Sequence, residues 1–214
     1  MVVAAICSTF AYAQEGKMAK DSMKEGSKMF VSAEDAAKKA LNVGAKMPSF
    51  TLNDSLGKPV NSADLLKQGH LVVVFYRGAW CPFCNAYLHK LQKNLPQIRE
   101  NGGNLVAISV ENADRSMAVA KKNELNFTVL SDPNLNVARS FGIVYQLSDE
   151  INEKYKGYGI DLVKYNKTEK PELPISATYV VSKKGEIAYA FVESDYQKRA
   201  EPEAILQALA KLKK

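Results

Sequence analysis

Two cysteines, Cys81 and Cys84, are separated by two residues and are the side chains of this 214-residue chain best suited to chemistry. The thiolate is the reactive form of cysteine, and a CxxC pair at a helix start can have a thiol pKa of roughly 3.5 to 7.5, below the ~8.5 of a free cysteine. The same spacing lets one sulfur close on the other as a disulfide. The pair therefore predicts a redox-active dithiol.

The residues around the pair assign different roles to the two sulfurs. Arg77 places a fixed positive charge four residues before Cys81, and the unpaired N–H groups of a helix start favour an anion. We expect Cys81 to be the attacking thiolate, at the exposed edge of the first helical turn. Cys84 lies deeper on the apolar face, so burial is expected to raise its pKa and leave it as the partner that closes the disulfide.

A structural zinc site and a structural disulfide are the two alternatives to a redox-active pair. Half of a zinc site would need two further ligands, for which the chain offers Cys7, His70 and His89. A structural disulfide would close a four-residue loop, which strains easily and is readily reduced. The redox pair is favoured over both, so no metal and no cofactor is predicted.

Two aromatic residues, Trp80 and Phe83, flank the cysteines. They could form a hydrophobic rim that limits solvent and contacts a substrate, or they could simply pack at the junction of strand and helix. Both are kept as substrate-binding candidates, because the sequence does not separate the two interpretations.

The elements that must position the cysteines are a strand, a tight turn and a helix. The run LVVVFY over 71–76 is apolar and rich in β-branched and aromatic residues, as a buried strand is, and it stops at Arg77-Gly78. After Cys81, apolar side chains recur every three or four residues, which predicts a helix with one face packed on the sheet. These side chains are Cys84, Leu88, Leu91, Leu95 and Ile98.

Strands and helices alternate along the rest of the chain. Buried strands over 104–110 and 127–132 follow the central strand through helical crossovers, which implies right-handed parallel pairing. This order predicts an α/β, thioredoxin-like fold, with a central mixed sheet flanked by helices. The other expected elements are a hairpin over 49–60 turning at Gly57, a helical turn over 62–66, helices over 113–123 and 133–141, a polar insertion over 147–172, a hairpin over 176–192 and a closing helix over 201–212.

The first thirteen residues carry no charge and end in Ala11-Tyr12-Ala13, a pattern typical of signal-peptide cleavage. We expect a signal peptide over 1–13, apparently truncated, and an exported protein, periplasmic or secreted; an apolar element of the mature fold is the alternative. Residues 14–42 are expected to form a polar linker and a short helix, and residues 43–214 the thioredoxin-like domain. Cleavage would remove Cys7 and leave only the CxxC pair, which favours a chemical role for that pair.

The charge of the chain is modest and scattered. Its net charge is +6, with no interleaving of aromatic and basic residues, so we expect no nucleic-acid partner. The apolar N-terminal stretch is too short to span a bilayer, so no membrane span is expected.

The segment FYRGAWCPFC over 75–84 resembles the centre of the alkyl hydroperoxide reductase/thiol-specific antioxidant (AhpC/TSA) family of peroxiredoxin-like proteins. Weaker matches follow in the family's order, namely PSFTLNDSLGKPV, LSDPNLNVARSFGI, GIDL and DYQKRAEPE, so that the resemblance spans about 43–212. It implies a peroxiredoxin-type thioredoxin fold with an N-terminal β-hairpin extension. It also implies reduction of peroxides or disulfides through Cys81, with Cys84 resolving and an external dithiol, such as a thioredoxin-like protein, as reductant.

Two positions differ from typical members of the family. Gly78 stands where most carry threonine or serine, and Ser176 stands at a strand start where they carry arginine or, in some relatives, proline. Ser176 is expected to face the CxxC pair and to contact an incoming substrate. Arg77 is assigned to stabilising the thiolate and the peroxide oxygen. Tyr196 and Arg199 fall within the resemblance, but nothing in the residues themselves gives them a role.

Three classes of function remain open on the sequence. The favoured class is a thiol-dependent peroxidase that reduces hydroperoxides through a dithiol/disulfide cycle, because the resemblance outside the centre is to peroxide enzymes. The second is an exported thiol-disulfide oxidoreductase that acts on protein disulfides. The third is a non-enzymatic module that binds a metal or a partner. A homodimer is possible in each case.

Overall fold

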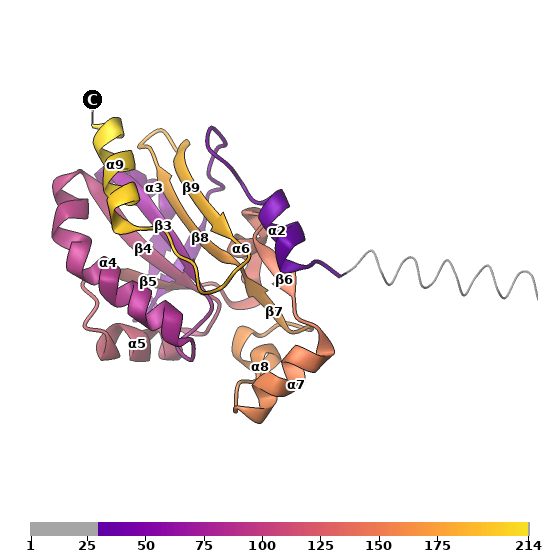
Figure 1. Cartoon of the computed structure of the whole chain (residues 1–214). Coiled ribbons are helices and arrows are strands. Elements are labelled where there is room, and N and C mark those ends of the chain that lie inside the picture. The colour runs from indigo at the N-terminus through magenta and orange to yellow at the C-terminus, as the bar shows by residue number, and fades with distance from the viewer. Residues whose placement is uncertain (1–29, 214) are drawn as a thin grey trace, which may run out of the picture. The chain divides into compact units, whose positions relative to one another are not determined.

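The computed structural model describes residues 30–213, which contain a seven-stranded sheet with helices on both faces and a separate two-stranded sheet (Figure 1). Ser32–Lys214 form one compact unit, which includes the short helix that the sequence places beside the linker. The expected signal peptide over 1–13 and Cys7 lie outside the described residues. No helix within 30–213 is long and apolar enough to cross a membrane.

The described helices and strands follow one another closely along the chain. The helices are α2 (Ala33–Lys39), α3 (Ser62–Gln68), α4 (Pro82–Glu100), α5 (Ala113–Lys122), the 3-10 turn η1 (Pro133–Leu135), α6 (Asn136–Ser140), α7 (Asp149–Gly157), α8 (Leu162–Asn166) and α9 (Pro202–Leu212). The strands are β1 (Thr51–Asp54), β2 (Pro59–Asn61), β3 (His70–Tyr76), β4 (Gly103–Ser109), β5 (Thr128–Ser131), β6 (Val144–Gln146), β7 (Glu172–Pro174), β8 (Ser176–Val181) and β9 (Ile187–Glu193).

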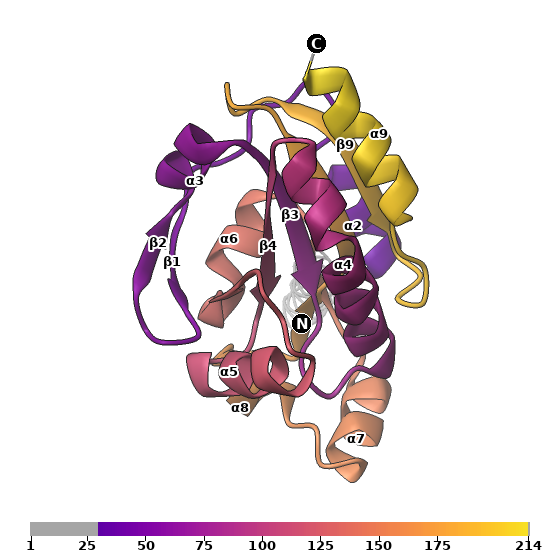
Figure 2. The same ribbon diagram turned by 90° about the vertical axis from the view of Figure 1, so that its left-hand side faces the viewer.

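The large sheet is mixed, and its strand order is β2-β1-β5-β4-β3-β8-β9. Strands β3, β4 and β5 run parallel, whereas β8 pairs antiparallel with β3 and β9 antiparallel with β8. The hairpin β1–β2 turns at Gly57, extends the sheet beyond β5, and lies at the edge opposite β9 (Figure 2). The predicted fold class, with its mixed sheet and N-terminal hairpin extension, is confirmed.

Side chains of β3 alternate between two apolar cores, one on each face of the sheet. Val72 and Val74 belong to the core beneath α4, α5 and α9, which lie together on one face (Figure 1). On the other face, the ring of Phe75 lies 4.9 Å from the ring of Phe141 and 6.4 Å from that of Tyr179. A strand buried on both faces reads as a continuous apolar run, which is why its position was predictable.

Helix α4 fastens the site to this core. It runs unbroken through Pro96, and the face predicted to be apolar is buried. Each fully buried aliphatic side chain contributes roughly 1.5–3 kcal/mol to folding, so this face holds the helix start firmly against β3. The buried residues of the helix are Cys84, Tyr87, Leu88, Leu91, Leu95 and Ile98.

Two predicted segments differ in detail from the structure. The polar insertion contains α7 and α8, and β6 and β7 pair at its ends. These helices begin at side-chain caps, where Ser148 accepts from the N–H of Ile151 and Asp161 from that of Lys164, rather than at an apolar periodic run. The helix predicted over 133–141 is broken, because Asn134 and Leu135 adopt positive φ angles of 69° and 61°.

The break is stabilised by the buried carboxylate of Asp132, which accepts hydrogen bonds from the N–H groups of Val137 at 3.1 Å and Ala138 at 2.8 Å. Burial raises the pKa of Asp132 from 3.8 to about 6. Between these two pH values the folded protein holds a proton that the unfolded chain releases. Raising the pH through this window must therefore lower the free energy of unfolding.

We predict that Asp132→Asn removes this part of the pH dependence, because the amide does not titrate. Between pH 4 and 6 the wild type should lose on the order of 2–3 kcal/mol of stability relative to the variant. Denaturant unfolding across this pH range measures the difference. Asp114→Asn, at an exposed aspartate of α5, is the matched control; parallel curves for wild type and Asp132→Asn would contradict the prediction.

Candidate functional site

The CxxC pair lies where the central strand β3 gives way to α4. Cys81 is the N-cap residue with extended backbone angles, and Pro82 takes the first helical position, where its missing N–H has no cost. The N–H of Cys81 donates to the carbonyl of Gly78 at 3.2 Å, which closes a tight turn. As the sequence predicts, both sulfurs stand at the N-terminus of a helix that follows a central strand.

Both thiols are reduced, and each residue is only 1% exposed. The expectation that Cys81 lies at an exposed edge is therefore wrong. Cys81 belongs to the same apolar cluster as Cys84 and Tyr76. Local periodicity placed Cys81 at the edge of the helix, but side chains from distant parts of the chain converge beside it.

Arg77 is buried within a ring of aromatic side chains. Its Cζ lies 4.5 Å from the ring centroid of Tyr196, 4.9 Å from that of Trp80 and 5.8 Å from that of Tyr155, which also accepts a hydrogen bond from Nη2. Such cation–π contacts partly replace the hydration that a buried guanidinium loses. The Nε atom has no hydrogen-bond partner within the described residues.

A second guanidinium, that of Arg199, reaches the pair from the loop between β9 and α9. Its Nη2 donates to Cys84 Sγ at 3.4 Å, and its Nη1 donates to Ser176 Oγ at 2.7 Å, to the Lys198 carbonyl at 2.6 Å and to the Tyr196 carbonyl. Among residues 30–213, no carboxylate forms an ion pair with Arg77 or Arg199. Sequence reasoning gave Arg199 no role, and its only signal was its place in the weak motif DYQKRAEPE.

Ser176 begins β8 beside the end of β3 and is buried. Its hydroxyl is occupied as the acceptor for Arg199. The structure therefore connects this residue to the thiols through a guanidinium, and its contact with substrate stays a prediction.

The two thiols differ in acidity, in the direction that the sequence predicts. The pKa of Cys81 is lowered to about 6, first by interaction with the Cys84 thiol and then by the Cys84 N–H and the charges of Arg77 and Arg199, against the effect of burial. The pKa of Cys84 is raised, mainly by burial and then by Cys81. At neutral pH the pair therefore holds one thiolate, on Cys81, and one thiol, on Cys84.

Residues 43–190 match the model of one protein family, described as the AhpC/TSA family. The chain belongs to this family. Peroxiredoxin Bcp of Escherichia coli strain K12 is 33% identical to it over 103 residues, which cover 48% of this chain and 65% of that relative's length. Chloroplastic peroxiredoxin Q of Sedum lineare is 32% identical over 140 residues, which cover 63% of this chain and 74% of the relative.

Solved structures resemble this AhpC/TSA protein in fold at lower sequence identity. Peroxidoxin BcpB from Mycobacterium tuberculosis matches with a TM-score of 0.64 at 19% identity, over 80% of this chain and 98% of that one. Peroxiredoxin Q from Xanthomonas campestris matches with a TM-score of 0.59 at 18% identity, over 77% and 92%. These likenesses establish the peroxiredoxin-type thioredoxin fold.

The loop before Cys81 is held from two sides in this AhpC/TSA protein. Glu111, which is 0% exposed, accepts from the N–H of Ala79 at 2.6 Å and from Arg115 at 3.1 Å, and burial raises its pKa. From α4, the Asn85 amide donates to the carbonyls of Ala79 at 2.8 Å and Cys81 at 3.1 Å. The loop geometry, and with it the direction of Cys81, is therefore fixed by partly buried polar contacts.

Gly78 departs from the family pattern because its position leaves no space for a side chain. A Cβ atom built there would lie 2.6 Å from Trp80 Nε1 and 2.9 Å from the carboxyl carbon of Glu111, and the φ angle is 144°. The indole and the carboxylate thus occupy the space that a threonine side chain would need.

The two aromatic candidates have different surroundings. Trp80 is half-buried, its ring lies 5.4 Å from that of Tyr155, and its Nε1 has no partner in the described part of the chain. Phe83 is 41% exposed and stands edge-on to the exposed ring of Tyr196 at 5.7 Å. Trp80 thus packs at the junction and keeps a buried N–H without a described partner, whereas Phe83 and Tyr196 form an outward-facing aromatic pair; contact of Trp80 and Phe83 with substrate stays a prediction.

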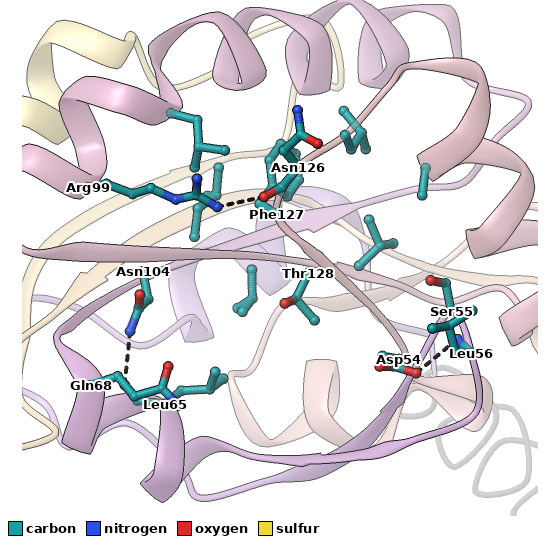
Figure 3. A pocket seen from close by; sticks show the side chains of 16 residues that line it. Asp54, Ser55, Leu56, Leu65, Gln68, Arg99, Asn104, Asn126, Phe127 and Thr128 are labelled. Atoms are coloured by element: carbon teal, nitrogen blue, oxygen red, sulfur yellow. Dashed lines mark hydrogen bonds between the residues drawn. The ribbon is translucent and has the colours of Figure 1, made fainter.

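A cavity of about 430 Å³ lies apart from the thiols, between the β1–β2 hairpin, α3 and the strands β4 and β5 (Figure 3). Arg99 and Asn104 stand in its wall and donate to backbone carbonyls, at Asn126 and Leu65 respectively. Neither cysteine lines it. Within residues 30–213, no three His, Cys, Asp or Glu side chains gather as metal ligands.

We predict that Gly78→Ala displaces Trp80 or Glu111, lowers stability by about 1–3 kcal/mol, and raises the pKa of Cys81 as the loop shifts. Denaturant unfolding and a pH titration of thiolate absorbance measure both effects. Gly57→Ala is the matched control, because Gly57 also has a positive φ but no atom lies within 4 Å of its added Cβ. Equal behaviour of the two variants would contradict the steric explanation.

Proposed function

We propose that this protein is a thiol-dependent peroxidase that reduces hydroperoxides through a dithiol/disulfide cycle between Cys81 and Cys84. The observation that carries the proposal is the reduced pair itself: one thiol has a pKa of about 6 and contacts a thiol with a raised pKa. Two guanidinium groups without carboxylate partners in the described chain lie beside them, which favours an anionic sulfur. Membership of the AhpC/TSA family and relatives named as peroxiredoxins support the same reaction.

In the first step the Cys81 thiolate attacks one oxygen of the peroxide, and the O–O bond breaks. Cys81 becomes a sulfenic acid, and the other oxygen leaves as an alcohol or water after taking up a proton. In the second step the Cys84 thiolate attacks the sulfenic sulfur, the S–O bond breaks, and hydroxide leaves as water after protonation. An external dithiol then reduces the disulfide by thiol-disulfide exchange and is itself oxidised.

Arg77 has the geometry to assist the first step. It is held by Tyr155 and the surrounding rings, so its position is fixed before substrate arrives. Its Nε and the Trp80 Nε1 are buried donors without partners within residues 30–213. Such preorganised donors stabilise oxygen atoms on which negative charge develops.

The second candidate function is that of a thiol-disulfide oxidoreductase acting on protein disulfides through mixed disulfides. The outward-facing pair of Phe83 and Tyr196 favours it, because an exposed aromatic pair beside the thiols suits contact with an extended chain. An external reductant of the peroxidase cycle would need the same contact. The two functions are therefore separated by the fate of the first intermediate.

We predict that Cys84→Ser keeps the first step and stops the second. After one equivalent of hydrogen peroxide, intact mass should show one added oxygen, on Cys81, whereas the wild type should show a disulfide. Cys81→Ser is the control and should not react. If Cys84→Ser gains no oxygen but accumulates mixed disulfides with a protein substrate, the oxidoreductase replaces the peroxidase.

The rate of the first step should follow ionisation of Cys81. Because the Cys81 pKa is about 6, the second-order rate constant should rise about tenfold between pH 5 and 7 and then level off. Stopped-flow fluorescence of Trp80, the single tryptophan, follows this step. Cys84→Ala should move the midpoint upward more than Cys84→Ser, because the Cys84 thiol is the largest cause of the lowered pKa and serine keeps a hydroxyl donor.

We further propose that the protein is exported, on the strength of the uncharged stretch ending in Ala11-Tyr12-Ala13. The N-terminal residue of protein recovered from a periplasmic fraction tests this. A homodimer remains a prediction, which sedimentation velocity tests.

A further inference from the structure

Two cationic side chains lie beside the thiol pair, which carries only one negative charge at rest. Arg77 and Arg199 both stand beside the sulfurs, whereas a single thiolate, on Cys81, is present at neutral pH. The neighbouring Tyr76 and Tyr145 stay neutral, because burial raises the pKa of both phenols. One guanidinium is therefore left without an anion of its own until the reaction proceeds.

Arg199 is aimed at Cys84. Of the contacts its guanidinium makes, the only one to a sulfur within residues 30–213 runs from Nη2 to Cys84 Sγ at 3.4 Å, while Nη1 is held by Ser176 Oγ and two backbone carbonyls. No carboxylate of the described chain forms an ion pair with Arg199; Glu201, the nearest in sequence, pairs with Lys90, and Glu193 pairs with Lys198. Three oxygen acceptors thus hold the Arg199 guanidinium beside Cys84, the sulfur that is protonated at rest.

We propose that Arg199 is a catalytic residue of the second step, in which it stabilises the Cys84 thiolate that attacks the oxidised Cys81. This inference rests on the proposed function. It assigns separate sulfurs to the two arginines: Arg77 serves the attack on peroxide, and Arg199 serves formation of the disulfide.

Oxidation of Cys81 changes the pKa of Cys84, and this change orders the two steps. In the resting site the negative charge of Cys81 is one of the causes that raise the pKa of Cys84. Conversion of Cys81 to a neutral sulfenic acid removes that charge, while the attraction of Arg199 for an anion on Cys84 remains. The pKa of Cys84 must then fall, so the second nucleophile becomes available only after the first has reacted.

Titration of Cys84 alone tests the proposal without any peroxide. In Cys81→Ser the replaced side chain is neutral, as the sulfenic acid is, and the thiolate absorbance of Cys84 is read against a Cys81→Ser/Cys84→Ser blank. Adding Arg199→Gln should raise the pKa of Cys84 by about one unit or more. Arg199→Lys should restore part of the shift, and Arg99→Gln, at an arginine in the wall of the separate cavity, should leave the pKa unchanged.

A second, kinetic experiment uses protein that keeps both cysteines. Above pH 7, where Cys81 is already ionised, Arg199→Gln should leave sulfenic acid formation within about threefold of wild type and slow disulfide formation about tenfold or more, a loss that higher pH recovers. If Arg199→Gln does not fold, Ser176→Ala, which removes one of the three acceptors of Nη1, should shift the same quantities in the same direction by less.

Two outcomes overturn the proposal. One is a Cys84 pKa unchanged by Arg199→Gln; the other is an equal loss in both kinetic steps that raised pH does not recover. Failure of the proposed function looks different, because the wild type would then form no sulfenic acid with peroxide, while the titration of Cys84 would still decide what Arg199 does.

Discussion

A sulfur anion kept away from water is the constraint on which the site depends. Cys81 and Cys84 are almost fully buried, and removing an ion from water is costly unless charge and hydrogen bonds replace the lost hydration. The helix start of α4, the second thiol and two guanidinium groups supply that replacement. Each remaining part of the site can be understood as holding one of these groups in place.

The arginines beside the thiols face the same problem, because a buried guanidinium also loses its hydration. Buried Arg77 has no carboxylate partner among the described residues, and aromatic faces and one phenol surround it instead. A carboxylate there would neutralise the cation and compete with the thiolate for it. Cation–π contacts with aromatic rings hold the guanidinium in place without neutralising its charge, so that charge still acts on the sulfur. The insertion that carries α7 thus has a chemical reason, since it delivers Tyr155 to this ring of side chains.

What could be predicted from the sequence was local, and what could not was brought together from far along the chain. Strand β3, the start of α4 and the direction of the pKa difference between the two cysteines follow from residues within a short stretch around FYRGAWCPFC. The contact between Arg77 and Tyr155 joins residues 78 positions apart, and that between Cys84 and Arg199 joins residues 115 apart. Neither has a periodic or spacing signal. Burial of Cys81 was missed for the same reason, because no local pattern reports what packs over a helix start.

The family resemblance pointed to some of the residues that make these long-range contacts. It drew attention to the segment holding Tyr196 and Arg199 but could not say which sulfur the arginine reaches. It also marked Gly78 and Ser176 as unusual, and each has a physical account in the contacts of its neighbours. Ser176 stands where typical members carry arginine, and here the guanidinium comes instead from the loop before α9.

Burial of both sulfurs should also make them less accessible to large reagents than to small ones. A peroxide of a few atoms needs little more room than a water molecule, whereas a bulky thiol or an alkylating reagent must displace the side chains around the helix start before it meets sulfur. Selectivity among oxidants and other thiols would then depend on movement of the side chains that cover the two sulfurs. The exposed rings of Phe83 and Tyr196 pack edge-on to each other next to the CxxC segment, so their movement would be part of any such opening.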